Sequence, residues 1–367
     1  MRAKVVMSVL VFVLGCEREA KKPAVPQNAR EYAVMAAPLA EPTLVDDRAP
    51  DAPRSVVLVT IDGVRWQDVF KGSDRMLAWG TKLVNGPTMP RTMKIIAERG
   101  VSIGGGEDNC GVVMPANKTF VSLPGYQEIL SGRVTTCQTN VCKRITSPSV
   151  LDVAAAHLVG PVASIGSWEM LERAATNGAN DDGLFLSEGR TPADKRTSPL
   201  GAAMIAGERA KPFPGTGDYR PDENTEQVAL AYLREQRPAF LHIGLGDTDE
   251  HGHHGDYAAY VGALRSADGF IVELADTLDE IGLDAAVIVT TDHGRSRWFR
   301  DHGPIFPESG RAFVLGFGSG VANTGATCAA HNVTLADVGA TARELLDLPR
   351  DTEAGAGTPI GELLATH

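Results

Sequence analysis

Three short apolar runs, each ending abruptly in acidic or imidazole side chains, constrain the fold more than any other feature of the sequence. The clearest begins at Ala285 and leads through AAVIVTT into Asp292, His293 and Gly294. Such a run, closed by a polar cluster, indicates a buried parallel strand. In open α/β sheets the chemistry lies at the carboxyl ends of such strands, so we expect Asp292 and His293 at a functional edge.

The other two runs have the same form. SVVLVTID ends at Asp62, and AFLHIGLGD ends at Asp247, which is followed by His251. An acid or an imidazole that is buried without a partner costs free energy, whereas a divalent metal binds both. Three strand ends that carry Asp or His therefore predict one shared metal centre.

Helical patterns separate the expected strands along the chain. We expect helices at 91–100, 126–130, 149–157, 167–175, 223–235, 257–281 and 334–348, and further strands at 101–103, 161–165 and 311–317. This alternation predicts an α/β fold, with a mostly parallel central sheet and helices on both faces. The polar stretch 177–220, rich in Gly and Pro, is expected to be an insertion that forms a lid or subdomain.

The first sixteen residues, MRAKVVMSVLVFVLGC, have a basic start, a short apolar core and a small-residue finish, which is typical of an export signal. The VLGC end resembles a bacterial lipobox, which predicts lipid attachment at Cys16 and a protein anchored to a membrane in the periplasm or at the cell surface. The alternative is a plain signal peptide with a coincidental Cys. Residues 17–53 are rich in Ala, Pro and charge, as in a flexible tether. We expect the folded domain at 54–350 and a C-terminal tail at 351–367.

Export favours disulfide formation among the remaining cysteines. Cys137 and Cys142 are five positions apart and most simply close a small loop, which leaves Cys110 with Cys328. A zinc ion bound by cysteines is the alternative, although the sequence has no Cys-x-x-Cys. The net charge of -11, without a basic cluster, argues against a nucleic-acid partner. Nothing in the sequence indicates the oligomeric state.

A candidate nucleophile lies in the stretch PANKTFVSLPGYQEILSG, residues 115–132. Ser122 precedes Leu123, Pro124 and Gly125, and a proline at this place is typical of the first turn of a helix. The first backbone N–H groups of a helix favour an anion, so a serine there can meet a phosphate group. A helix N-cap is the alternative role for Ser122.

With these residues in hand, the chain resembles the alkaline phosphatase superfamily over about residues 55–350. The resemblance is nearest to the nucleotide pyrophosphatase/phosphodiesterase-like and phosphate-monoesterase branches. It rests on seven positions that occur in the family's order: Asp62, Ser122, Asp247 with His251, Asp292 with His293, and His302 ahead of the strand RAFVLGFG.

The resemblance implies two zinc ions. One would be bound by Asp247, His251 and His302, and the other by the remaining four positions, Asp62, Ser122, Asp292 and His293. It also implies hydrolysis of a small-molecule phosphate ester, a monoester or a diester, in which Ser122 attacks phosphorus. The alternatives are a sulfate or phosphonate ester hydrolase on the same metals, and a surface lipoprotein that binds metal without turnover.

The nucleophile and two of the expected metal ligands have alternative candidates in the sequence. Thr119 lies in the family's KTF pattern, but Ser122 has the family's interval of ten residues to Gly132. His331 is the alternative to His302, but it follows the RAFVLGFG strand. Asp249 is the alternative to Asp247, which we prefer for its Asp-x-x-x-His interval to His251.

Other polar residues near these motifs have weaker expected roles. His253 and His254 are expected behind the ligands or in solvent. Asn140 is the best match for the asparagine that contacts a phosphate oxygen in the two nearest branches. Lys143 and Arg144 are expected in solvent, with a terminal phosphate as the alternative partner. Cys-x-Pro-x-Arg, which sulfatases of the superfamily need, is absent.

Overall fold

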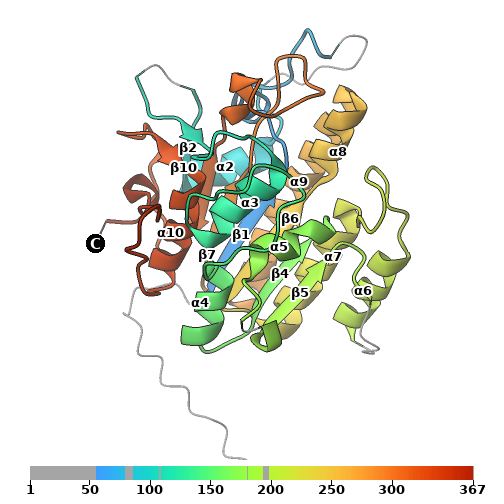
Figure 1. The fold of residues 1–367 in the computed structure, drawn as a ribbon, viewed down its shortest axis with the longest axis vertical. Coiled ribbons are helices and arrows are strands. Elements are labelled where there is room, and N and C mark those ends of the chain that lie inside the picture. The colour runs from blue at the N-terminus through green and yellow to red at the C-terminus, as the bar shows by residue number, and fades with distance from the viewer. Residues whose placement is uncertain (1–54, 79–85, 107–108, 180, 193–197, 367) are drawn as a thin grey trace, which may run out of the picture. The chain divides into compact units, whose positions relative to one another are not determined.

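The computed structural model describes residues 55–78, 86–106, 109–179, 181–192 and 198–366, and an eight-stranded sheet lies at its centre (Figure 1). The strand order is β5-β4-β6-β1-β7-β8-β2-β9. β8 is antiparallel to β7 and β2, and the other neighbours are parallel. The bounds are β1 (Ser55–Ile61), β2 (Gly100–Ile103), β4 (Val162–Gly166), β5 (Leu184–Glu188), β6 (Phe240–Leu245), β7 (Ala285–Thr290), β8 (Val314–Gly318) and β9 (Gly325–Ala326). The mostly parallel α/β sheet predicted from the sequence is confirmed.

The strand β1 lies between β6 and β7, and every residue in it is buried. Val56 and Leu58 contribute to the core on one face of the sheet, and Val57 and Val59 contribute to the core on the other. Because helices cover both faces, a central parallel strand must be apolar on both sides. This requirement explains why the three runs are continuous rather than alternating.

Helices cover both faces of the sheet (Figure 1). One core cluster includes residues of α3 (Ser122–Ser131), α4 (Val150–His157), α5 (Glu172–Ala175) and α10 (Leu335–Leu345). The other includes residues of α1 (Trp66–Lys71), α2 (Pro90–Arg99), α6 (Pro199–Arg209), α7 (Asp222–Gln236) and α9 (Tyr257–Ile281). The shorter elements are α8 (Asp247–His254), η1 (Glu169–Leu171), η2 (Asp181–Gly183), η3 (Pro307–Gly310), η4 (Gly361–Leu363) and the parallel pair β3 (Val113–Met114) and β10 (Val333–Thr334).

The described part of the stretch 177–220 belongs to the central sheet and its helices, which corrects the expectation of an inserted lid or subdomain. It contains β5, the edge strand that pairs in parallel with β4, and α6, which packs beside α7. Phe185 of β5 stacks on Tyr232 of α7 with ring centroids 4.6 Å apart. The apolar residues of β5 are Leu184, Phe185 and Leu186. Because so short an apolar run lies among polar residues, the sequence pattern did not predict this strand.

The last residues also belong to the folded domain rather than to a free tail. Ile360 and Leu363 are buried, and the backbone N–H of Ala322 donates to the carbonyl of Leu363 at 2.9 Å. The predicted signal peptide, Cys16 and the tether lie outside the described residues. Within the described residues, no helix combines the length and apolar character needed to cross a membrane.

Candidate metal and nucleophile site

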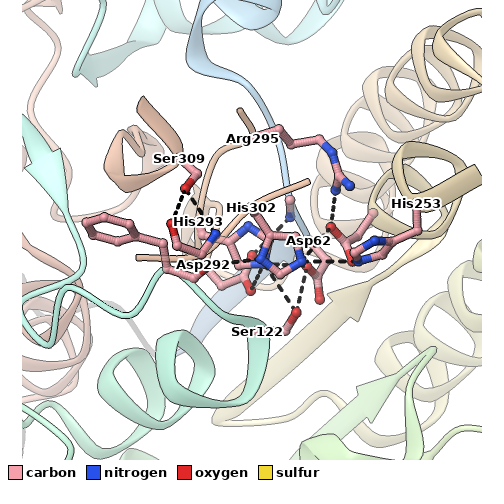
Figure 2. A network of polar contacts seen from close by, with 12 residues as sticks. Asp62, Ser122, His253, Asp292, His293, Arg295, His302 and Ser309 are labelled. Atoms are coloured by element: carbon pink, nitrogen blue, oxygen red, sulfur yellow. Dashed lines mark hydrogen bonds and ion pairs between the residues drawn. The ribbon is translucent and has the colours of Figure 1, made fainter. Parts of the chain in front are cut away.

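The predicted nucleophile begins the helix α3, at the carboxyl edge of the sheet. Ser122 Oγ lies 3.2 Å from His293 Nε2 and 3.4 Å from Asp62 Oδ1 (Figure 2). Asp62 follows β1 and His293 follows β7, so two strand ends and one helix start converge on a single hydroxyl. Only 4% of Ser122 is exposed, which keeps this group of polar atoms away from bulk water.

Close packing between α3 and the end of β7 depends on a glycine. A Cβ atom at Gly125 would lie 2.7 Å from the carbonyl oxygen of Asp292 and 2.9 Å from its Cβ atom. Any larger residue would therefore push the helix away from the strand end. Gly125 allows the nucleophile and the acid–imidazole pair to share one site.

Asp62, Asp292 and His293 form the first group that could hold a metal ion, with one ligand atom of each within 4.8 Å of the others. Burial raises the pKa of Asp62 well above its ordinary value, and the charges of Asp292 and Asp249 raise it further. Asp292 is fully buried, and its Oδ2 atom has no hydrogen-bond partner among the described residues. A buried carboxylate oxygen in this state fits a cation.

Asp249, His253 and His302 form the second such group, again within 4.8 Å. Asp249 Oδ2 lies 3.0 Å from His253 Nε2, and the Nε2 atoms of His253 and His302 are 3.1 Å apart. The rings of His302 and His293 stack with their centroids 4.0 Å apart, so the two groups adjoin each other (Figure 2).

Arg295 lies behind Asp249 and is only 2% exposed. Its guanidinium pairs with Asp249 Oδ1 and donates to the carbonyls of Phe299 and Arg300. Burial alone would raise the pKa of Asp249, but Arg295 and then His302 outweigh it and hold that pKa well below the ordinary value. Arg295 directly follows the Asp-His-Gly motif, and the sequence analysis did not identify it.

The orientation of two histidines fits metal binding. His293 Nδ1 lies 2.8 Å from the carbonyl oxygen of Gly294, and His302 Nδ1 lies 2.8 Å from that of Phe120. A carbonyl only accepts, so Nδ1 carries the proton in each ring and Nε2 keeps its lone pair. Burial also lowers the pKa of both histidines, which favours the neutral ring. Both Nε2 atoms are thus prepared as ligands.

The structure does not bring Asp247 and His251 into either group. Asp247 Oδ1 accepts hydrogen bonds from the Tyr219 hydroxyl at 2.7 Å and from the Asp222 N–H at 3.3 Å. The ring of His251 lies against that of Phe213, with centroids 5.9 Å apart. The structure instead brings Asp249 and His253 beside His302. These two residues have the same Asp-x-x-x-His interval and lie on nearly the opposite face of α8.

The structure also distinguishes the remaining alternatives for the nucleophile and for the metal ligands. Thr119 Oγ1 donates to Asn117 Oδ1 at 2.7 Å instead of joining Ser122. His331 is exposed and belongs to neither metal-binding group, whereas His302 belongs to the second. His254 is exposed and stacks with Phe213, with ring centroids 6.3 Å apart.

Asn140 lies beside the nucleophile helix. Its Oδ1 atom accepts a hydrogen bond from the backbone N–H of Leu123 at 2.9 Å. Lys143 is exposed, and Arg144 pairs with Glu172 and Asp181. Neither basic side chain therefore joins the metal-binding groups.

Both predicted cysteine pairings are present as disulfides. Cys110 is bonded to Cys328, and Cys137 is bonded to Cys142. Cys110–Cys328 joins positions with a sequence separation of 218 residues, and Cys137–Cys142 closes a second loop between positions with a separation of five residues. The second loop contains Asn140.

Taken together, the described residues fit two adjacent divalent cations. The first group supplies two carboxylates, one imidazole and the Ser122 hydroxyl, and the second supplies one carboxylate and two imidazoles. Mixed nitrogen and oxygen donors of this kind suit borderline transition-metal ions better than calcium or magnesium.

A family model described as "Metalloenzyme superfamily" matches residues 205–350. This range includes five of the residues in the two groups, Asp249, His253, Asp292, His293 and His302. No curated protein matches the chain in sequence.

Solved structures share the fold at low sequence identity. The alkaline phosphatase PafA has a TM-score of 0.59 and 12% identity, and the match covers 87% of this chain and 100% of that one. A phosphonate monoester hydrolase of Agrobacterium radiobacter has a TM-score of 0.54 and 15% identity, with 84% and 77% covered. A putative sulfatase from Bacteroides thetaiotaomicron has a TM-score of 0.54 and 13% identity, with 84% and 74% covered.

Proposed function

The chain has the fold of the alkaline phosphatase superfamily, and on this premise we propose that it is an exported two-zinc hydrolase of phosphate esters. One observation carries the proposal. Ser122 Oγ, at the start of a helix, lies within 3.4 Å of a carboxylate and an imidazole that both belong to a metal-binding group. We assign one zinc ion to Asp62, Asp292, His293 and Ser122, and the other to Asp249, His253 and His302.

When bound, two such ions supply positive charge to the attacking and leaving oxygens of an in-line displacement and lower the pKa of a hydroxyl. Ser122 is the nucleophile: its Oγ attacks phosphorus, the P–O bond to the alcohol breaks, and a phosphoseryl ester forms. Water then attacks this ester at phosphorus and frees Ser122 and the phosphate product. The buried position of Ser122 limits side reactions with bulk water.

Asn140 has a binding role in this proposal. Because its Oδ1 atom accepts from Leu123 N–H, both N–H donors of its amide remain for another acceptor beside Ser122. A nonbridging oxygen of the esterified phosphate is such an acceptor. This contact would hold the substrate while Ser122 attacks.

The test is a panel of aryl esters with one leaving group: a phosphate monoester, a phosphate diester, a phosphonate and a sulfate. We expect turnover of at least one phosphate ester, close to two zinc ions per chain by elemental analysis, and loss of both the metal and the activity on dialysis against a chelator. Zinc should restore the activity. Turnover of the sulfate or the phosphonate alone would replace the phosphate assignment, and calcium or magnesium as the only metal would contradict the zinc assignment.

We also propose that the protein is a lipoprotein anchored through Cys16, on the evidence of the VLGC end of the export signal. Mass spectrometry of the native mature protein should find a lipid-modified Cys16 at its N-terminus. Cys16→Ser should move the protein from the membrane fraction to the soluble fraction without changing its specific activity. If Cys16→Ser stays fully membrane-bound, the anchor lies elsewhere.

A further inference from the structure

The loop 135–143 is attached to the nucleophile helix by one buried side chain. Gln127 of α3 is 3% exposed. Its Oε1 atom accepts from Thr135 Oγ1 at 2.9 Å, and its Nε2 atom donates to the carbonyl of Lys143 at 2.9 Å. A single glutamine therefore holds both ends of the loop.

The disulfide Cys137–Cys142 closes the same loop from within, with a Cα–Cα distance of 5.8 Å. The Cys142 N–H donates to the carbonyl of Thr139 at 3.3 Å, and Arg173 donates to the carbonyl of Cys142 at 2.9 Å. Apolar packing does little to hold the centre of the loop, since Val141 is 80% exposed. The covalent bond is thus a principal constraint on the shape of the loop.

Asn140 lies at the centre of the closed loop and reaches the start of α3. Leu123 is the second residue of that helix, and the first N–H groups of a helix have no partner within it. Asn140 Oδ1 satisfies the Leu123 N–H at 2.9 Å. The amide of Asn140 is thereby fixed one residue from Ser122.

From this arrangement we propose that the Cys137–Cys142 disulfide and Gln127 position Asn140 for substrate binding and act through it. The inference rests on the proposed function for the role of Asn140, but not for the contact with Leu123. An asparagine on an open loop would have to lose its conformational freedom each time the substrate binds. The disulfide removes most of that freedom in advance, because a closed loop of this size has few conformations.

Hydrogen exchange at the Leu123 amide tests the positioning without any assay of activity. In the zinc-loaded protein, Cys137→Ser with Cys142→Ser should accelerate exchange at Leu123 by at least about tenfold, because the Asn140 contact protects that N–H. The internal control is the N–H of Gly125, which donates to the carbonyl of Val121 and should exchange as before. Unchanged exchange at Leu123 would overturn the proposal.

A double-mutant cycle tests whether the disulfide acts through Asn140. The double serine variant should lower kcat/KM by about tenfold, and Asn140→Ala should lower it by at least as much. In the Asn140→Ala background, loss of the disulfide should cost nothing further. Additive losses would show that the disulfide acts by another route and would contradict the proposal.

The Cys110–Cys328 disulfide is the matched control. Cys110→Ser with Cys328→Ser opens a loop of 218 residues instead of five, so it should lower the melting temperature more. Its effect on kcat/KM should be less than about twofold, since this disulfide does not close the loop of Asn140. Equal losses of kcat/KM at both disulfides would indicate general destabilisation. The hydrogen-exchange comparison decides the proposal if this control does not fold.

The outcomes separate this inference from the proposed function. If the wild-type protein hydrolyses no ester of the panel but Leu123 loses its protection in the double serine variant, the positioning stands and the proposed function fails. If the esters are hydrolysed but Leu123 keeps its protection, the proposed function stands and the positioning fails.

Discussion

At the residue scale, the site depends on which atom of each side chain is already engaged. His293 and His302 direct Nδ1 to backbone carbonyls, and Asp249 directs Oδ1 to Arg295. The other atom of each side chain, Nε2 of the histidines and Oδ2 of Asp249, remains for a metal. Such outer contacts orient ligands and tune their affinity.

The identity of the nucleophile gives the first prediction. Ser122→Ala should lower kcat by several orders of magnitude and leave zinc content and folding almost unchanged, because the six Asp and His ligands remain. Thr119→Ala should cost at most about tenfold, since the Thr119 hydroxyl donates to Asn117 and not to the residues around Ser122 that the structure describes. The measurement is steady-state kinetics, together with peptide mapping of a phosphorylated intermediate trapped at low pH. A phosphoryl group on Thr119 would refute the assignment.

The two aspartates of α8 give a matched pair of variants. Asp249→Asn should reduce zinc from about two ions to about one per chain, since it removes a charged ligand and leaves Arg295 buried without its partner. Asp247→Asn should keep both ions, because an amide oxygen can still accept from Tyr219 and Asp222. Elemental analysis of the purified variants decides between them. Loss of zinc in Asp247→Asn alone would restore the original ligand assignment.

At the element scale, α8 explains why the sequence motif could be read in two ways. Asp247 with His251 and Asp249 with His253 are both four residues apart, so each pair can lie on one face of a helix. Two residues correspond to about 200° of rotation, which puts the pairs on nearly opposite faces. Only the packing of α8 decides which face meets His302.

The close approach of α3 to the end of β7 gives a prediction about Gly125. Its control is a second glycine variant that should change the free energy of unfolding in the opposite direction. Gly125→Ala should lower the free energy of unfolding by about 1–3 kcal/mol and turnover by about a hundredfold, because its Cβ would collide with Asp292 and displace the helix. Gly262→Ala, on α9, has open space at its Cβ and should stabilise by about 0.5–1 kcal/mol. Chemical denaturation and kinetics measure both. If Gly125→Ala is also stabilising and fully active, the close approach is not required.

At the scale of the whole molecule, the parallel sheet collects distant residues at one edge. β1 and β7 are neighbours and β6 adjoins β1, so residues that follow these strands meet although they lie up to 231 positions apart, as Asp62 and His293 do. The same edge carries Glu188, at the end of β5 and 7% exposed. The buried charge there affects the stability of the entire domain.

Glu188 gives a prediction about pH. Burial raises its pKa from 4.5 to about 7, so the folded state holds this proton more tightly than the unfolded state does. The free energy of unfolding should therefore fall as pH rises from about 4.5 to about 7, by about 3 kcal/mol from this group. Glu188→Gln cannot ionise, so its stability relative to the wild type should increase between pH 5 and pH 8. Denaturation of the zinc-loaded proteins at both values tests this, and parallel pH profiles would contradict it.

The central sheet and its polar edge could be predicted from the residues alone. Long apolar runs that end in Asp or His favour central strands with a functional end, which predicts that Asp62, Asp292 and His293 lie at one edge of the sheet. Regular helices such as α9 were equally readable, because their hydrophobic period extends over many turns. The number and spacing of the cysteines favoured the two disulfides but left a zinc ion bound by cysteines as an alternative, and the structure contains both disulfides.

The choice among chemically equivalent neighbours required the folded structure. It places Asp249 and His253, rather than Asp247 and His251, beside His302, it places Arg295 behind Asp249, and it shows that the stretch 177–220 contains β5 and α6. The physical reason is common to all three. Spacing along the chain restricts which residues share a face, but the direction in which that face points depends on contacts with segments far away in sequence.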